Sequence, residues 1–130
     1  MMKKENIKEF VKETLGCDCP ENVFTSIDSQ LNVKLNNDIL LNSKINIGNR
    51  LLIHVIEVND SNSIKSNLST LVSMGKRERD RGGFNRFRLV LITDKMNEIR
   101  KIAYMIFKNL EDKDEKVHLH VIDRNEMSVW

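Results

Sequence analysis

The stretch Leu51-Leu52-Ile53-His54-Val55-Ile56-Glu57-Val58 is almost continuously apolar and rich in β-branched residues. Two later stretches, at residues 87–93 and 117–122, repeat this composition. Each has the length of a strand, and near-continuous apolar runs are typical of strands that are buried on both faces of a parallel sheet. The three stretches therefore predict the parallel core of an α/β fold.

Helical patterns fill the two intervals between these strands. They predict one helix over residues 63–74, which Gly75 would end, and a second helix over residues 95–110. Two consecutive strand–helix–strand units have right-handed crossovers, so both helices are expected on the same face of the sheet. The predicted buried stripes are Ile64, Leu68, Leu71 and Val72 in the first helix, and Ile99, Ile102, Ala103, Ile106 and Leu110 in the second.

An amphipathic helical pattern also covers residues 4–15, and Gly16 follows where a helix would end. Its apolar stripe consists of Ile7, Phe10, Val11 and Leu15. This helix is the available cover for the other face of the sheet. We therefore expect residues 1–130 to form a single three-layer α/β domain with a central, mainly parallel sheet.

Residues 25–49 are the hardest part of the chain to assign. Apolar and polar residues alternate around Leu31 and again around Ile45, which favours two short strands, and residues 36–38 read as a turn. The pattern predicts a hairpin or an edge excursion, with an irregular loop as the alternative. Because this region could add an antiparallel strand, a ferredoxin-like α+β sheet is the alternative fold.

Composition restricts the classes of function. Lys and Arg number 21 against 19 Asp and Glu, and a net charge of +2 is too small for a protein built mainly to coat nucleic acid or acidic membranes. No apolar run approaches the roughly 20 residues of a membrane span, and the charged start lacks a signal-peptide core. Two cysteines one residue apart cannot form a disulfide framework, so we expect a cytoplasmic protein.

The segment Cys17-Asp18-Cys19-Pro20 is the most specific local feature. Cys19 precedes a proline that suits the first turn of a short helix over residues 20–24, and a thiol at a helix N-terminus has a lowered pKa. The two thiols could instead join His118 and His120 in a zinc site, or join the same pair of a second chain around zinc or an iron–sulfur cluster. The structural alternative is simple packing. We expect the turn to lie at the surface.

The three histidines all lie in predicted strands. His118 and His120 are two residues apart and therefore point to the same side of the sheet. His54 and Arg88 would share that side if the strand registers agree. Such a face is either only partly covered or forms a ligand or metal pocket, because two imidazoles on one strand suit a metal ion.

The most basic stretch is residues 76–88, where six Lys or Arg residues face two acids. Its arginines could contact the phosphates of RNA, and Phe84 could stack on an unpaired base. The alternative is a solvated helix end whose arginines pair with Glu78 and Asp80. Because Gly82 and Gly83 adjoin the charges, we expect the segment to be mobile. The candidate phosphate-binding residues are Arg77, Arg79, Arg81, Arg86 and Arg88.

Acidic residues follow the predicted parallel strands: Glu57 and Asp60, then Asp94, then Asp123. Ligands of parallel sheets usually bind at this edge, and carboxylates there could hold a magnesium ion. The alternative is that Asp60 and Asp94 cap the helices that follow them. Because the basic stretch precedes a strand, it lies at the opposite edge of the sheet, so the two patches cannot form one site.

The stretch Glu13-Thr14-Leu15-Gly16-Cys17-Asp18-Cys19-Pro20-Glu21-Asn22-Val23-Phe24 resembles the start of small, uncharacterised prokaryotic proteins that carry an ETLGCxCPxxVF sequence. The likeness covers about a dozen residues, with a looser echo in residues 48–52. It implies that the Cys-x-Cys-Pro turn is a real feature of such proteins, and it implies no activity.

No catalytic constellation is visible, since the sequence has no GxSxG elbow, no HExxH motif and no glycine-rich phosphate loop. We therefore expect a binding or regulatory module rather than a conventional enzyme, with a candidate thiol or metal centre at residues 17–20. The alternative is phosphate or RNA binding through residues 76–88. A third possibility is a protein partner, or a second copy of the chain, docked on the polar sheet face or on residues 127–130.

Overall fold

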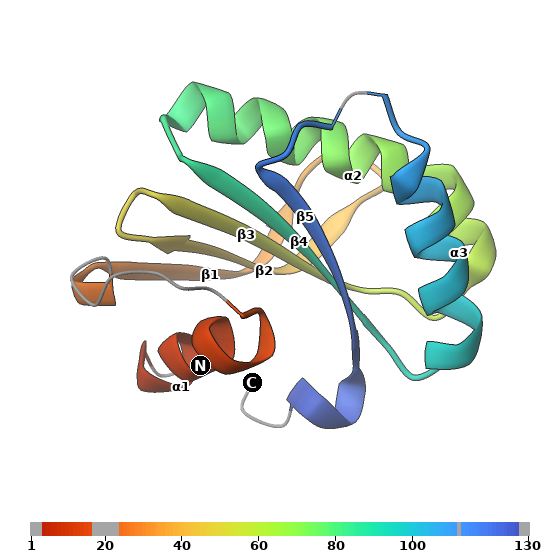
Figure 1. The fold of residues 1–130 in the computed structure, drawn as a ribbon, viewed down its shortest axis with the longest axis horizontal. Coiled ribbons are helices and arrows are strands. Elements are labelled where there is room, and N and C mark those ends of the chain that lie inside the picture. The colour runs from red at the N-terminus through yellow and green to blue at the C-terminus, as the bar shows by residue number, and fades with distance from the viewer. Residues whose placement is uncertain (1–3, 17–23, 112, 128–130) are drawn as a thin grey trace.

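The computed structural model of the chain describes residues 4–16, 24–111 and 113–127, which form a mixed α/β domain around a five-stranded sheet (Figure 1). The strands are β1 (Ile27–Lys34), β2 (Leu40–Ile47), β3 (Leu51–Glu57), β4 (Arg86–Thr93) and β5 (Val117–Asp123). The helices are α1 (Lys4–Glu9) with its π-helical continuation η1 (Phe10–Thr14), α2 (Ser61–Gly82), α3 (Met96–Lys108) and the short η3 (Arg124–Met127). In the described residues, no helix combines the length and the apolar character needed to cross a membrane.

The strands lie side by side in the order of the sequence. β3, β4 and β5 are mutually parallel, which confirms the prediction of two strand–helix–strand units. β1 and β2 instead pair antiparallel with each other, and β2 pairs antiparallel with β3, so the expected mainly parallel sheet is wrong. The reason is the length of the connections: short turns join these strands, and a short turn can connect only antiparallel neighbours. The ferredoxin-like alternative is also wrong, because the antiparallel strands form an edge hairpin and do not alternate with the parallel ones.

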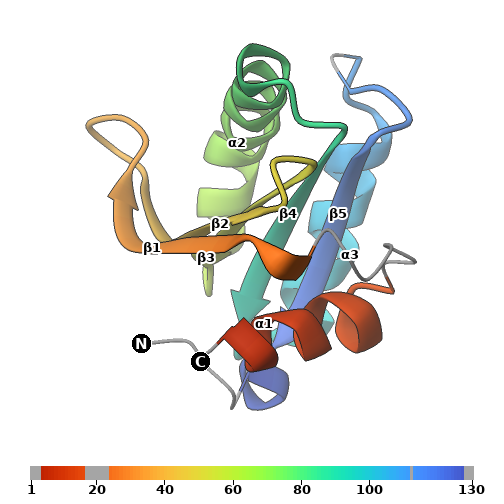
Figure 2. The same ribbon diagram turned by 90° about the vertical axis from the view of Figure 1, so that its left-hand side faces the viewer.

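The helices cover both faces of the sheet (Figure 2). α2 and α3 pack on one side, called here the α2–α3 face, and α1 with η1 packs on the other, called the α1 face. The apolar stripe predicted for helix α2 is confirmed, since all four of its residues, Ile64, Leu68, Leu71 and Val72, are buried. The strand residues expected to be among the least exposed are also buried: Ile53, Val55, Leu89, Leu91, Leu119 and Val121.

Helix α2 is longer than the sequence indicated. It passes through Gly75 and ends at Gly82, so the basic residues up to Arg81 are helical; the expected mobility of this segment stays a prediction. Gly75 has a packing role: a Cβ atom on it would lie 2.0 Å from Cζ of Phe87, which is fully buried. The helix stops at Gly83, whose φ of 75° is left-handed and therefore suits glycine.

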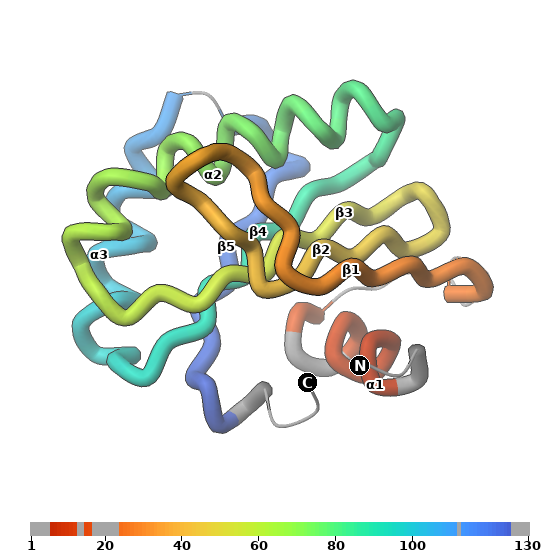
Figure 3. The backbone as a smooth tube through the Cα atoms, turned by 180° about the vertical axis from the view of Figure 1, so that it is seen from behind, coloured from red at the N-terminus to blue at the C-terminus, as the bar shows by residue number. Residues whose placement is uncertain are grey.

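The hairpin of β1 and β2 confirms one interpretation of residues 25–49. Its turn is held by Asn36, whose Oδ1 accepts hydrogen bonds from the backbone N–H groups of Asp38 and Ile39, both at 2.8 Å. The hairpin curls out of the plane of the other strands, as twisted two-stranded ribbons do, and its tip lies beside α2 (Figure 3). There the Asn36 side chain contacts Sδ of Met74 at 3.9 Å. The curl leaves a concave surface between the hairpin and the second half of α2.

Candidate functional site

Only two of the four residues of the predicted thiol or metal centre are among the described residues. Cys17, Cys19 and the short helix expected from residue 20 fall in the segment outside the described residues, so their role stays a prediction. His118 and His120 are described and are half-buried on the α1 face. Within the described part of the chain, no group of three or more His, Cys, Asp or Glu side chains is placed to hold a metal ion.

One ring nitrogen of His120 is engaged by a buried arginine, Arg88. Arg88 is 6% exposed, and its Nη1 donates to the backbone oxygen of Leu15 at 2.9 Å and lies 2.8 Å from Nε2 of His120. Because a guanidinium can only donate, this ring nitrogen acts as the acceptor and the imidazole is neutral. Burial, and then the charge of Arg88, lower the pKa of His120 to about 4. The contact ties β4 and β5 to the end of η1, and the other ring nitrogen of His120 has no hydrogen-bond partner among the described residues.

His54 does not share a face with the other two histidines, and that expectation is wrong. In the observed register Arg88 pairs with His118, whereas His54 pairs with Leu89 and therefore points to the α2–α3 face. There its ring is fully buried and meets Phe87 edge-on, with the centroids 4.9 Å apart. Its Nε2 lies 3.4 Å from Oε1 of Glu78, which projects from α2.

The five candidate arginines do not form one patch. Arg79 is buried and binds Asp114 through two hydrogen bonds of 2.8 and 2.6 Å, so it fastens the loop before β5 to α2. Arg86 and Arg88 are two residues apart on β4, and both belong to the α1 face. Only Arg77 and Arg81 remain together, one turn apart on α2 and exposed to solvent.

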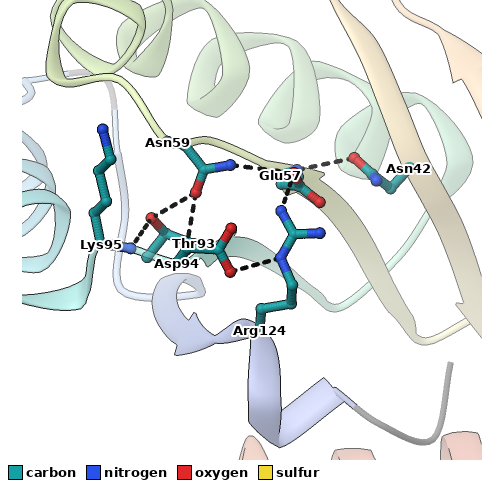
Figure 4. Close-up of polar contacts among 7 residues, drawn as sticks. All are labelled: Asn42, Glu57, Asn59, Thr93, Asp94, Lys95 and Arg124. Carbon is teal, nitrogen blue, oxygen red and sulfur yellow. Dashed lines mark hydrogen bonds and ion pairs between the residues drawn. The ribbon is translucent and has the colours of Figure 1, made fainter.

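The carboxyl edge of the parallel strands is closed by a basic residue (Figure 4). Arg124 forms ion pairs with Glu57 and with Asp94, the second at 2.7 Å. The Oδ1 of Asn59 accepts hydrogen bonds from the Thr93 hydroxyl at 3.1 Å and from the Asp94 amide at 2.8 Å. The acidic charge expected to attract magnesium is therefore already partly neutralised by an arginine.

The other two acids of this edge also have structural partners. Asp60 is the N-cap of α2, as one interpretation predicted, and accepts from the amide of Asn62 at 3.0 Å. Asp123 accepts from the amide of Asn125 at 3.0 Å. Asp94 is not a cap, since α3 begins after Lys95, whose amide donates to the Thr93 hydroxyl at 3.0 Å. The interpretation of these acids as helix and turn residues is therefore supported for Asp60 and Asp123.

The concave surface beside the hairpin brings together basic residues from three segments. We call it the hairpin groove, and its first part, the cationic arm, is a cavity of about 530 Å³ between β1, β2 and the end of α2. A second cavity of about 380 Å³, the polar arm, continues along the hairpin. The two arms share Lys44, Glu78 and Phe84. The cationic arm is further lined by Lys34, Met74, Arg77 and Arg81, and the polar arm by Asp28, Ser29, Gln30 and Asn46.

Positive charge is in excess in the cationic arm. Its only acid, Glu78, is paired with Lys44 and faces His54. Burial opposes ionisation, but the contacts of the carboxylate with His54 and Lys44 outweigh it and lower the pKa of Glu78 to about 2. Across the described residues, Lys34, Arg77 and Arg81 take part in no ion pair. Three cations therefore face the cavity without a counter-charge.

The end of α2 places an aromatic ring between the two arms. Gly83 reverses the chain, and the amide of Phe84 donates to the backbone oxygen of Arg79 at 2.9 Å, the closing bond of a Schellman motif. The ring of Phe84 is half-buried and lines both cavities. Sequence reasoning identified Phe84 and two of the arginines, and it missed Lys34 and Lys44 because only the curl of the hairpin brings them to α2.

The known proteins supply no template for this site: no protein-family model, no curated protein and no solved structure matches the chain.

Proposed function

We propose that this protein is a binding module for a phosphate-bearing ligand, which the hairpin groove holds. The observation that carries the proposal is the set of three unpaired cations, Lys34, Arg77 and Arg81, around one cavity. Phosphate oxygens accept charge-assisted hydrogen bonds from guanidinium and ammonium groups, and arginine binds them in a bidentate manner. By contrast, Arg79 and Arg124 are each paired with two carboxylates.

Local charge, and not net charge, supports this function. The whole chain carries only +2, so a general affinity for polyanions is not expected. A concave site concentrates the field of its cations, and the ligand would contact several of them at once. The cavity of about 530 Å³ lies within the usual size of ligand sites, about 300–1,000 Å³.

The decisive experiment removes two of the cations and compares that variant with a control variant that loses the same charge elsewhere. Binding of a fluorescent single-stranded oligonucleotide is measured by anisotropy, with inorganic polyphosphate as a competitor. The Arg77→Gln/Arg81→Gln variant is expected to bind more weakly, and the negative slope of log K against log salt should become shallower by about 1.4, or about 0.7 for each lost contact. The control is Arg100→Gln/Lys101→Gln on α3, which removes the same charge at a distance from the groove.

A third variant should act in the opposite direction. Glu78→Gln removes the only acid of the cationic arm and releases Lys44, so it should tighten binding to either polyanion. An equal loss of affinity in the two double variants, or the absence of binding to both probes, would overturn the proposed function.

A further inference from the structure

We infer that the ligand of the hairpin groove is a nucleotide unit, with its phosphate in the cationic arm and its unpaired base in the polar arm, stacked on Phe84. This inference rests on the proposed function and names the chemistry of its ligand. A nucleotide unit has two sources, a free nucleotide and a single-stranded nucleic acid, and the experiment below separates them.

Charge is divided unequally between the two arms. The cationic arm carries the three unpaired cations, whereas the polar arm carries the acid Asp28 beside uncharged Gln30 and Asn46. A ligand that is charged along its whole length, such as polyphosphate, would meet a carboxylate at one end of the groove. A ligand with one anionic end and one uncharged end that forms hydrogen bonds fits both arms.

The polar arm has the groups that contact base edges. Asp28 and Gln30 are two residues apart on β1, and their strand partners are Asn46 and Lys44, so their side chains share one face. In the described residues neither the Asp28 nor the Gln30 side chain has a hydrogen-bond or ion-pair partner, whereas the Asn46 side chain is used to hold the turn through Asn49. Carboxylates accept from base amino groups and glutamine both donates and accepts, which are the usual contacts to the edges of unpaired bases.

Phe84 lies where the base and the phosphate would join. Its ring borders both cavities, and the Schellman motif at the end of α2 fixes its backbone. Aromatic side chains beside a cationic groove are the common device for holding unpaired bases, and each stacked base contributes about 1–3 kcal/mol. The bases of double-stranded nucleic acid would not be available to stack on the ring, because they are already stacked and paired with each other.

The experiment compares probes with and without bases on the full chain. The probes are a single-stranded oligonucleotide, the same strand with abasic sugars throughout, inorganic polyphosphate and the four ribonucleoside triphosphates. We expect the base-bearing strand to bind more tightly than the abasic strand. Phe84→Leu should weaken the base-bearing strand roughly 5- to 150-fold and leave the abasic strand unchanged. Phe84→Tyr, which keeps an aromatic ring, should retain the affinity and shows that the position tolerates substitution.

The outcomes separate this inference from the proposed function. Equal affinity for the abasic strand, the base-bearing strand and polyphosphate would overturn the nucleotide assignment and leave the phosphate-binding function standing. Binding of none of the probes would overturn both. Tight binding of a triphosphate identifies a free nucleotide as the source, and binding of the strand alone identifies single-stranded nucleic acid; each supports the inference. Urea unfolding of every variant confirms that the protein is folded.

Discussion

The carboxyl edge of the parallel strands and the hairpin groove are both rich in charged residues, but they treat charge differently. At the carboxyl edge, Arg124 lies between Glu57 and Asp94 and satisfies both. In the groove, Arg77 and Arg81 face a cavity and pair with no carboxylate of the described chain. The first arrangement joins the carboxyl ends of β3, β4 and β5, and the second leaves binding capacity unused. Pairing, more than the number of charges, therefore distinguishes a structural cluster from a candidate binding site.

The same contrast exists within one helix. Arg77, Arg79 and Arg81 are consecutive basic residues at alternate positions of α2, yet only Arg79 is buried and paired. A helix turns by about 100° per residue, so residues two apart point in very different directions. Arg79 is thereby directed to Asp114 near β5, and its neighbours are directed to the hairpin.

The largest effect on stability is expected from substituting Gly75, which lets helix α2 pack closely against Phe87 of the sheet. Gly75→Val would place side-chain atoms within the ring of Phe87, which is fully buried. We expect a loss of about 3 kcal/mol in the free energy of unfolding, at the upper end for overpacking. Urea unfolding measures it, with the exposed Ser69→Val on the same helix as the control. Similar losses in the two variants would contradict the packing role of Gly75.

The next test compares the paired and unpaired arginines directly. Arg79→Ala should lower the free energy of unfolding by about 2 kcal/mol, because it removes charged hydrogen bonds from a mostly buried site. Arg77→Ala should change it by less than about 0.5 kcal/mol, as is usual for an exposed residue without such contacts. Only Arg77→Ala should weaken oligonucleotide binding. A large stability loss in Arg77→Ala would remove the distinction.

Acid should weaken the paired sites by protonating their carboxylates. Hydrogen bonding to Arg79 lowers the pKa of Asp114 from 3.8 to about 2, and the contacts of Glu78 lower its pKa from 4.5 to about 2. A carboxylate whose pKa is depressed on folding stabilises the protein above its unfolded pKa. Stability is therefore expected to be complete above about pH 5 and to fall as the pH approaches 2.

Variants assign that loss to individual carboxylates. Asp114→Asn and Glu78→Gln should each unfold more readily at neutral pH and show a shallower decline between pH 5 and pH 2. Urea midpoints at several pH values measure both effects. The exposed Asp38→Asn serves as the control, since its carboxylate forms no ion pair among the described residues. An unchanged pH profile in both variants would mean that neither pair contributes.

Local patterns were sufficient to predict most of the fold. The continuous apolar runs identified the parallel strands because both of their faces are buried. The spacing of Ile7, Phe10 and Val11 identified the N-terminal helix α1 with η1. Gly75 misled the prediction of α2, since a glycine that packs against a ring and a glycine that ends a helix look the same in a sequence. Gly82-Gly83 carried the correct signal for that helix end.

The candidate site was less accessible to sequence reasoning. Phe84, Arg77 and Arg81 stand out in the basic stretch, but whether an arginine is free depends on contacts across the chain, such as that between Arg79 and Asp114. Lys34 and Lys44 gave no signal, because a lysine in an alternating strand is ordinarily a solvent-facing residue. The curl of the hairpin, which makes the groove, follows from tertiary packing and not from a local pattern.

The smallest effect is expected at the carboxyl edge, and its dependence on salt tests how the two regions differ. Arg124 and its two partners are all at least one-third exposed, so water already screens their attraction. Arg124→Gln should therefore lower the thermal midpoint slightly in dilute buffer and not at all near 1 M salt, where the Debye length is only about 3 Å. It should leave oligonucleotide binding unchanged, since the carboxyl edge lies at the opposite end of the strands from the end of α2. A loss that persists in high salt would show that Arg124 acts through packing or directed hydrogen bonds, and it would remove the contrast between an exposed, screened ion pair and the buried contact of Arg79.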